Sequence, residues 1–404
     1  MNTFKLAWRN IWRNRRRTIV TIAAMTIAMI ATINYSGLMN GYIHGMERNI
    51  LDFAFGDIQI HAPGYRDKPS LYKRIQNPEE LLGKLDAANL PGSARLLAAG
   101  LGALKETSAG VMLIGLDVER DARVSKIAGQ VDRGEWLSDT DSHGVVLGRR
   151  LARTLDAKPG DELVILGQAT DGSLANDLFK VRGVLRGVTD MTDRIGVFML
   201  EKTFRELMVM PSGAHQIVVR KPTQIELASA QETVSRLAPS LDVQTWRQLS
   251  PTLASMLDNV QGVVMVFMFI VYIAIALVIL NAMLMAVFER VREFGVLKAL
   301  GTSPGRVLKM IYTESAIQTG MAIACGMLLS IPLIYYLTTE GIYLGSEEGL
   351  AVMGLAWDPR MRALFDVQSF TRPVIMFTII VALAILYPAL KAAMIRPVRA
   401  MHHQ

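Results

Sequence analysis

The sequence contains a single cysteine, Cys325, so no disulfide can form within the chain. A folded region outside a membrane must therefore be stabilised by burial of apolar side chains, which a segment of about 200 residues allows. Charged residues make up only 20% of the chain and hydrophobic residues 51%, which argues against a fully soluble protein. The apolar surplus is expected in membrane-spanning segments.

Signatures of catalytic and metal sites are also missing. No Gly-x-x-x-x-Gly-Lys-Ser/Thr loop occurs, so the chain is not expected to bind nucleotide phosphates in the usual way. The six histidines have no metal-ligand spacing except His402–His403, which lacks carboxylate support. Asp190 and Asp193 are close in sequence, but an acidic pair in a loop is usually solvated. The sequence predicts no catalytic residue, no metal and no nucleic-acid partner.

Four long runs contain no Asp, Glu, Lys or Arg, and each approaches or exceeds the roughly 20 residues needed to cross a bilayer. They are Thr18–Met39, Val260–Phe288, Ser315–Thr339 and Pro373–Leu390. We interpret them as transmembrane helices. A buried helix of a soluble protein is the alternative for any one run, and a cleaved signal peptide is the alternative for residues 1–40, although this segment lacks a persuasive cleavage site.

Basic residues flank these runs on one side of the predicted membrane. They precede the first run, lie between the second and third, and follow the fourth, at Lys5, Arg9, Arg13, Arg15, Arg16, Arg17, Arg290, Arg292, Lys298, Arg306, Lys309, Lys391, Arg396 and Arg399. By the positive-inside rule, both termini are expected in the cytoplasm, and the segments that mix both charges should lie outside.

The predicted fold is an α-helical membrane protein with four transmembrane helices and a mixed α/β extracytoplasmic domain inserted between helices 1 and 2. Short strand and helix patterns alternate between Gly56 and Trp246. The expected segments are an amphipathic interfacial helix at 1–17, helix 1 and a stalk at 18–45, the α/β domain at 46–256, helix 2 at 257–288, a cytoplasmic coupling helix at 289–310, helix 3 at 311–338, an outer loop at 339–371, helix 4 at 372–392 and a cytoplasmic tail at 393–404.

Strand patterns are expected at 57–61, 95–105, 111–116, 162–166, 179–185 and 216–220, and helical patterns at 79–88, 149–155 and 224–237. Near the end of the first span, Gly37, Gly41 and Gly45 recur every fourth residue. Glycines on one helix face allow another backbone to approach closely, so a tight helix contact is expected there. Fraying of the helix is the alternative.

The segment from Glu289 to Pro304 has the pattern of two helices joined by a sharp turn. Gly301 can adopt the left-handed conformation that ends a helix, Ser303 can cap the next helix, and Pro304 suits its first turn. Charged and apolar residues alternate before the turn, as in a helix that docks onto a soluble partner. A solvated basic loop is the alternative from these residues alone.

The motif Glu289-Arg-x-Arg-Glu-Phe-Gly, with Ala299-Leu-Gly301, resembles the signature after the second span of MacB-type ABC permeases, the superfamily that includes the lipoprotein-releasing LolC/LolE and the division protein FtsX. The closing segment from Tyr387 to Ala400 is similar to theirs. Short motifs of the outer domain also fall in the order that these permeases show, at Gly115-Leu-Asp117, Gly134-Glu-Trp-Leu137, Val145-Val-Leu-Gly148, Leu151-Ala152 and Pro159-Gly-Asp161.

This resemblance implies a non-catalytic permease subunit that is driven by a separate ABC ATPase dimer, which would bind the ATP and Mg. The residues implied to contact or shape the ATPase interface are Glu289, Arg290, Arg292, Glu293, Gly295, Lys298, Leu300 and Gly301. Glu314 opens the third span, where Arg306 or Lys309 could reach it. The resemblance also implies an inner-membrane location and a second permease copy, identical or related.

The implied function is extraction of a lipoprotein or another amphiphile from the inner membrane, with a periplasmic carrier or adaptor as a possible partner. Substrate or helix contacts would involve Gly37, Gly41 and Gly45 of one copy and Val263 and Phe267 of the other. The alternatives are mechanotransmission or efflux of the MacB/FtsX type, acting on a periplasmic partner, peptide or drug. A sensor or receptor is a third class.

Overall fold

The computed structural model describes residues 3–13, 15–140, 142–343, 351–352, 355–356 and 360–394. These residues form two compact units. We call residues 1–44, 258–344 and 360–404 the membrane unit, and residues 45–257 and 345–359 the sheet domain. The predicted tail from residue 395 onward, with Arg396, Arg399 and His402–His403, lies outside the described residues.

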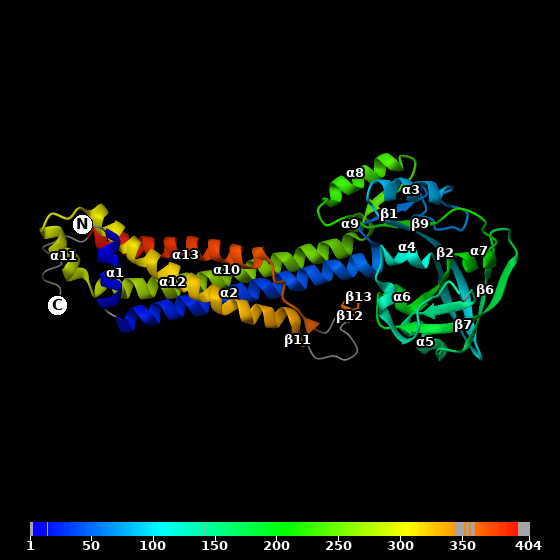
Figure 1. Ribbon diagram of the computed structural model, residues 1–404, viewed down its shortest axis with the longest axis horizontal. Helices are drawn as coiled ribbons and strands as arrows, with labels where there is room; N and C mark the ends of the chain where they lie inside the picture. The colour runs from blue at the N-terminus through cyan, green and yellow to red at the C-terminus, as the bar shows by residue number, and fades with distance from the viewer. Residues whose placement is uncertain are drawn as a thin grey trace. The chain divides into compact units, whose positions relative to one another are not determined.

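Four helices are long and apolar enough to cross a membrane. They are α2 (Arg15–Asn49), α10 (Pro251–Phe288), α12 (Pro304–Thr339) and α13 (Val367–Met394). Within the membrane unit they run side by side, and the short helices α1 (Thr3–Arg13) and α11 (Val291–Ala299) lie at the same end of the bundle, with α1 crossing the long helices (Figure 1). The prediction of a four-helix membrane protein is confirmed to this extent.

The inside of the membrane bundle contains small and polar side chains. Gly326 of α12 lies so close to α2 that a Cβ added there would be 2.7 Å from the side chain of Met29. The Asn34 amide donates to the carbonyl of Ile30 at 2.8 Å and to the hydroxyl of Ser330 at 3.5 Å. Interhelical contacts in lipid depend on such close packing and hydrogen bonding, because lipid tails are as apolar as leucine.

The sheet domain follows α2 and precedes α10 in the chain. Its ten-stranded sheet comprises β1 (Ile58–His61), β2 (Gly92–Leu104), β3 (Thr107–Leu116), β4 (Val131–Gly134), β5 (Gly144–Leu147), β6 (Glu162–Gln168), β7 (Leu174–Leu185), β8 (Gly196–Leu200), β9 (Gln216–Val219) and β10 (Asp242–Thr245). β2, β3, β8, β5, β7 and β6 pair in that order, and β6 pairs back to β2, which closes a ring of six strands.

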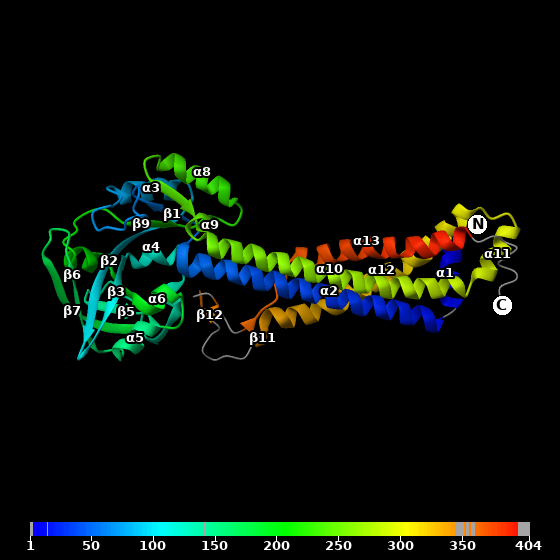
Figure 2. The ribbon, with the colours of Figure 1, turned by 180° about the vertical axis from the view of Figure 1, so that it is seen from behind.

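The inner face of this ring holds the main core, with Leu113, Leu163, Phe179 and Val197 at 0% exposure. The helices of the domain are η1 (Ile50–Phe55), α3 (Pro78–Ala87), α4 (Val118–Ala122), η2 (Ile127–Gln130), α5 (Arg149–Leu155), α6 (Asp190–Ile195), α7 (Glu201–Leu207), α8 (Leu227–Leu237) and α9 (Trp246–Leu249). α3 and α8 lie near β1 and β9 (Figure 2). Burial without disulfides therefore stabilises the domain.

Short strand pairs lie between α12 and α13: β11 (Ile342–Tyr343) pairs with β14 (Arg360–Met361), and β12 (Ala351–Val352) pairs with β13 (Leu355–Ala356). Every strand and helix expected in the sheet domain is present, with ends shifted by a few residues. Four strands of the ten-stranded sheet, β4, β5, β8 and β10, were not predicted as strands. β4 and β10 are mostly polar, and β5 and β8 are short apolar runs, which periodicity alone does not assign to a strand.

Candidate functional site

The segment between α10 and α12 folds as a short helix with a defined end. At the end of α11, the amide of Thr302 donates to the carbonyl of Leu297 and the amide of Gly301 donates to that of Lys298, each at 3.0 Å. Gly301 has a φ of +90°, as this C-terminal motif requires. Pro304 begins α12 as predicted, but Ser303 occupies the capping position without a side-chain capping hydrogen bond.

α11 has one face inside the bundle and one face outside. Phe294 is 1% exposed, and Val291 and Gly295 are buried beside it. Leu300 is 78% exposed, and Arg292 is exposed as well. Apolar burial through Phe294 therefore anchors the helix, while the Leu300 end is free to contact another molecule.

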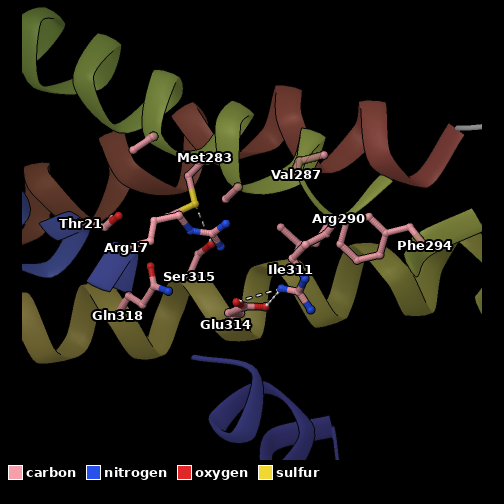
Figure 3. Close-up of a pocket in the computed structure, with 12 residues that line it drawn as sticks. Arg17, Thr21, Met283, Val287, Arg290, Phe294, Ile311, Glu314, Ser315 and Gln318 are labelled. Atoms are coloured by element: carbon pink, nitrogen blue, oxygen red, sulfur yellow. Dashed lines mark hydrogen bonds and ion pairs between the residues drawn. The ribbon is translucent and has the colours of Figure 1, made fainter. Parts of the chain in front are cut away.

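A buried ion pair links the start of α11 to α12. The Arg290 guanidinium donates to both carboxylate oxygens of Glu314, at 3.0 and 2.8 Å (Figure 3). The two side chains are only 13% and 10% exposed. Both bonds come from the same nitrogen, Nη1, so the pair joins the start of α11 to α12 through one donor group and two acceptor oxygens.

Further ion pairs connect this site to the beginning of the chain. Arg13, at the end of α1, pairs with Glu293, and Arg17, in the first turn of α2, pairs with Glu289. Glu293 also accepts from Arg290 Nε at 3.1 Å. Burial raises the pKa of Glu293, but Arg290 and Arg13 outweigh burial and hold that pKa below its usual value. We call these six residues, including Glu314, the charge network.

A small cavity of about 30 Å³ adjoins the charge network. Arg17, Glu314 and Gln318 line it, and the Oε1 atom of Gln318 is buried without a hydrogen-bond partner (Figure 3). A polar cavity of this size has room for water, which would satisfy the amide oxygen. Arg290 and Glu314 are therefore the buried part of the network, whereas Arg13, Glu289 and Glu293 remain exposed.

The structure uses several predicted interface residues inside the membrane unit. Glu289, Arg290 and Glu293 are in the charge network, and Gly295 is buried. Lys298 Nζ donates to the carbonyl of Ala393 at 2.7 Å. Arg292 and Leu300 remain exposed, and Gly301 shapes the turn.

The sequence interpretation did not include Arg13 and Arg17 in this site, and it considered Arg306 and Lys309 as possible partners of Glu314. The partner of Glu314 is Arg290, not Arg306 or Lys309. Lys309 precedes Glu314 by five residues on the same helix and points about 140° away from it, because each helical residue turns about 100°. An isolated acid in an apolar helix is itself the signal that a paired polar site exists.

The second group of predicted residues lies elsewhere in the chain. A Cβ on Gly37 would be 2.4 Å from Ile334 of α12, which fits the expected helix contact. A Cβ on Gly41 would be 2.1 Å from the carbonyl oxygen of Arg362, so this glycine accommodates the connection before α13 instead of a helix, and Gly45 has no atom within 4 Å.

Two residues of α10 complete that group. Val263 is 69% exposed and Phe267 is 50% exposed. The ring of Phe267 also stacks on Tyr35 of α2, with ring centroids 5.3 Å apart. Both residues lie on an apolar surface that suits lipid or another helix.

The motifs of the sheet domain are structural. Asp117 caps α4 by accepting from the amide of Arg120 at 2.8 Å. Gly134 has a φ of +80°, and a Cβ there would be 2.0 Å from the carbonyl oxygen of Arg182. Gly160, in the turn before β6, has a φ of +102°. These residues build turns and strand contacts within the sheet domain.

Two family descriptions match this chain. Residues 18–237 match the MacB-like periplasmic core domain, and residues 265–397 match the FtsX-like permease C-terminal family. The chain belongs to the MacB/FtsX/LolC family of ABC transporter permeases. It is thus a membrane protein whose sheet domain is of the MacB periplasmic type, and family relatives work with ATPase partners.

Relatives of this chain differ in length and in the function for which they are named. The chain is 22% identical to the lipoprotein-releasing system transmembrane protein LolE of Haemophilus influenzae, over 99% of both chains. It is 23% identical to the pyoverdine export ATP-binding/permease protein PvdT of Pseudomonas syringae, over 82% of this chain. It spans about half the length of the first curated relatives it matches, 51% for PvdT and 46% for an uncharacterized ABC transporter permease of Methanocaldococcus jannaschii.

A solved structure is also similar. The periplasmic region of MacB from Actinobacillus actinomycetemcomitans aligns with 52% of this chain and 97% of that one, at 15% identity and a TM-score of 0.39.

Proposed function

We propose that this chain is the permease subunit of an ATP-driven transporter and that a separate ATPase dimer drives it through α11. The observation that carries the proposal is the two-sided character of this helix. Phe294 and Arg290 tie α11 to the bundle, while Arg292 and Leu300 face outward. A partner that binds the exposed face of such a helix can displace it, and the buried face passes this displacement to the bundle.

The charge network provides a route for that force. Displacement of α11 would act on α12 through Arg290 and Glu314, and on α1 and α2 through Glu293 and Glu289. Ion pairs with several hydrogen bonds resist stretching better than apolar contacts, which slide. The ATPase would bind ATP and Mg, and α11 with its ion pairs would transmit the displacement to the other helices of this chain.

The arrangement in the membrane follows from charge. We place α1, α11 and both termini in the cytoplasm and the sheet domain outside an inner membrane, because Lys and Arg concentrate at the α1 and α11 end of the bundle. An ATPase dimer offers two equivalent docking sites, so a second permease copy, identical or related, would occupy the other one.

A lipid-anchored or amphiphilic cargo is the substrate that we favour. LolE, a relative that aligns over nearly the whole chain, is named for lipoprotein release. A periplasmic carrier or adaptor would then receive the cargo. The second candidate is efflux of a peptide or drug, or mechanotransmission to a periplasmic partner, and similarity to the exporter PvdT favours efflux between these two.

The experiment is to purify this chain with its cognate ATPase in lipid nanodiscs and to measure ATP turnover with and without a triacylated lipopeptide. Leu300→Asp places a charge on the exposed end of α11, where 78% exposure makes a folding defect unexpected. Leu300→Met is the matched control, since it keeps an apolar side chain of similar size.

The proposal expects lipopeptide to change ATP turnover in the wild type and in Leu300→Met, and Leu300→Asp to lose the response. A wild-type complex that turns over ATP but ignores lipopeptide would move the cargo to the second candidate. Failure of any ATPase to bind the wild-type chain would contradict the permease function and favour a sensor or receptor.

A further inference from the structure

A second cavity, unrelated to the charge network, lies in the sheet domain. Its volume is about 450 Å³, within the range of roughly 300–1,000 Å³ that is usual for small-molecule sites. Its walls come from the end of η1, from β1, β2, β3, β8 and β9, from α6 and from the first turn of α10.

The cavity lies on the outer face of the strand ring. Leu97 of β2 is directly paired with Ile114 of β3, which is paired with Phe198 of β8, so these three side chains share one face. Their neighbours Leu96, Leu113 and Val197 point the other way and are 0% exposed. Leu97 and Ile114 are only half-buried, so this face carries apolar side chains that the domain itself leaves uncovered.

Three buried polar side chains also line the cavity. Gln59, Arg95 and Gln216 are 4%, 9% and 9% exposed. Arg95 gives its Nε and Nη2 protons to Asp121, at 2.9 and 3.3 Å. The side-chain amide of Gln216 makes no hydrogen bond with any other described residue. Gln216 lines the cavity and its amide atoms are not fully enclosed, so they can pair with a group that enters the cavity.

The charge of the lining limits the ligand. Asp121 neutralises Arg95, and Arg150 and Arg194 pair with Asp190 at the edge of the cavity. A free anion would find no unpaired cation, and a free cation no unpaired carboxylate, among these residues. The best match is a neutral hydrogen-bonding group attached to an apolar body, such as the amide or ester of an acylated molecule.

We propose that this cavity binds one acyl chain of an amphiphilic substrate, with the amide or ester group of the acyl chain held by Gln216. This proposal rests on the proposed function and assigns it a site in the sheet domain. Leu97, Met112 and Ile114 would contact the chain, and methionine adapts readily to flexible apolar ligands. Phe53 and Phe55 belong to η1, the helix that follows α2 in the chain.

The test uses the full chain with its ATPase in nanodiscs and two photoactivatable probes. One probe is an N-palmitoyl dipeptide amide with a diazirine at the end of the acyl chain, and the other is an alkyl diazirine of equal length without an amide. Cross-linked residues are identified by mass spectrometry. Ile114→Trp fills the cavity, Gln216→Leu removes the amide at similar volume, and Leu178→Trp is the matched control on β7, at a residue that is 46% exposed and outside the lining.

The proposal expects the palmitoyl probe to label lining residues such as Met112 in the wild type and in Leu178→Trp, and Ile114→Trp to lose this label. Gln216→Leu should weaken labelling by the palmitoyl probe about threefold to tenfold, the effect of one neutral hydrogen bond, while leaving the alkyl probe unchanged.

Palmitoyl labelling confined to the transmembrane helices would overturn the proposal. Equal loss of both probes in Gln216→Leu would also overturn it, because the amide would then have no specific role. ATP turnover measured in the same samples separates the two proposals. A response to lipopeptide with no label in the cavity contradicts only the acyl site, whereas failure of the ATPase to bind contradicts the proposed function.

Discussion

The membrane unit and the sheet domain distribute polar and apolar side chains in opposite ways. In the sheet domain, Phe179 and Leu163 are fully buried. In the membrane unit, Val263 and Phe269 of α10 are 69% and 63% exposed, while Gln318 and Ser330 of α12 are buried. The first region is stabilised by removing apolar surface from water, and the second by close packing and polar contacts between helices.

This difference explains where force can be transmitted. Apolar contacts between helices in lipid cost little to exchange, because lipid replaces the lost neighbour. In the membrane unit, the polar contacts between helices are the ones that lipid does not replace. At the α11 end, the charge network provides such contacts between ionised side chains. The sheet domain, by contrast, can move as one folded body because its apolar core is formed by its own residues.

The largest loss of stability is expected when a large buried side chain is removed from the sheet domain, and the same change in the membrane unit serves as the comparison. Phe179→Ala in the sheet domain should lower its stability by about 3–5 kcal/mol, the usual cost for a buried phenylalanine. Phe377→Ala in α13, also 0% exposed, should cost clearly less because lipid tails are an apolar alternative. Hydrogen exchange of each region during thermal unfolding measures the loss of stability in both variants. Equal losses in the two regions would contradict the difference between them.

Breaking a buried ion pair should matter in both regions. Asp121→Asn in the sheet domain leaves Arg95 without its acid, whereas Glu314→Gln in the membrane unit leaves Arg290 paired with Glu293. We expect Asp121→Asn to lower stability by about 3 kcal/mol and Glu314→Gln to lower it by less. Only Glu314→Gln should also reduce coupled ATP turnover. Asp121→Asn, expressed at the wild-type level, should keep coupled ATP turnover. Loss of coupled turnover in this variant would contradict the assignment of coupling to the membrane unit.

Acid should weaken the sheet domain through His61 in β1. Burial, with help from Arg66, lowers the pKa of His61 to about 4. The unfolded chain takes up the proton first, near pH 6.5, so stability is highest above that pH and falls between pH 6.5 and about 4, by about 3 kcal/mol.

Hydrogen exchange of β1, corrected for the intrinsic effect of pH, measures this loss. His61→Phe keeps an aromatic ring beside Tyr65 and cannot be protonated, so it should reduce the pH dependence. Burial lowers the pKa of His215 as well, so part of the pH dependence should remain. A variant with the full wild-type pH dependence would show that His61 is not its source.

The smallest expected effect concerns the glycines of α2. Gly41→Ala places a Cβ 2.1 Å from the Arg362 carbonyl oxygen and should displace the connection before α13, at a cost of about 1–3 kcal/mol. Gly45→Ala, with no atom within 4 Å, is the matched control and should be neutral or slightly stabilising. The measurement is the thermal midpoint of each variant, and equal midpoints for the two would contradict the close approach at Gly41.

The sequence predicted the membrane helices well because each is a long run without charge, and it located Gly301 because a helix end has a strong local signal. The strands of the ring with marked apolar content, such as β7, were also predictable. The short strands β5 and β8 were not predicted as strands, since a short apolar run without alternation does not distinguish a strand from a buried helical segment.

The partners within the candidate site could not be predicted from local patterns. Arg13 and Glu293 are 280 residues apart, and Arg17 and Glu289 are 272 apart. Such pairings depend on how helices pack, which periodicity does not specify. The same holds for Gly41, whose neighbour is a connecting segment and not the helix that its four-residue spacing suggested.

We infer that the pair between Arg290 and Glu314 transmits motion from α11 to α12. The measurement is lipopeptide-dependent ATP turnover in nanodiscs for Arg290→Glu, Glu314→Arg and the double variant, in which the two charges are exchanged. Each single variant should lose the response, and the double variant should recover part of it, because a glutamate at position 290 also lies beside Glu293. A double variant as uncoupled as the single variants, although folded and bound to the ATPase, would show that this pair does not transmit the motion.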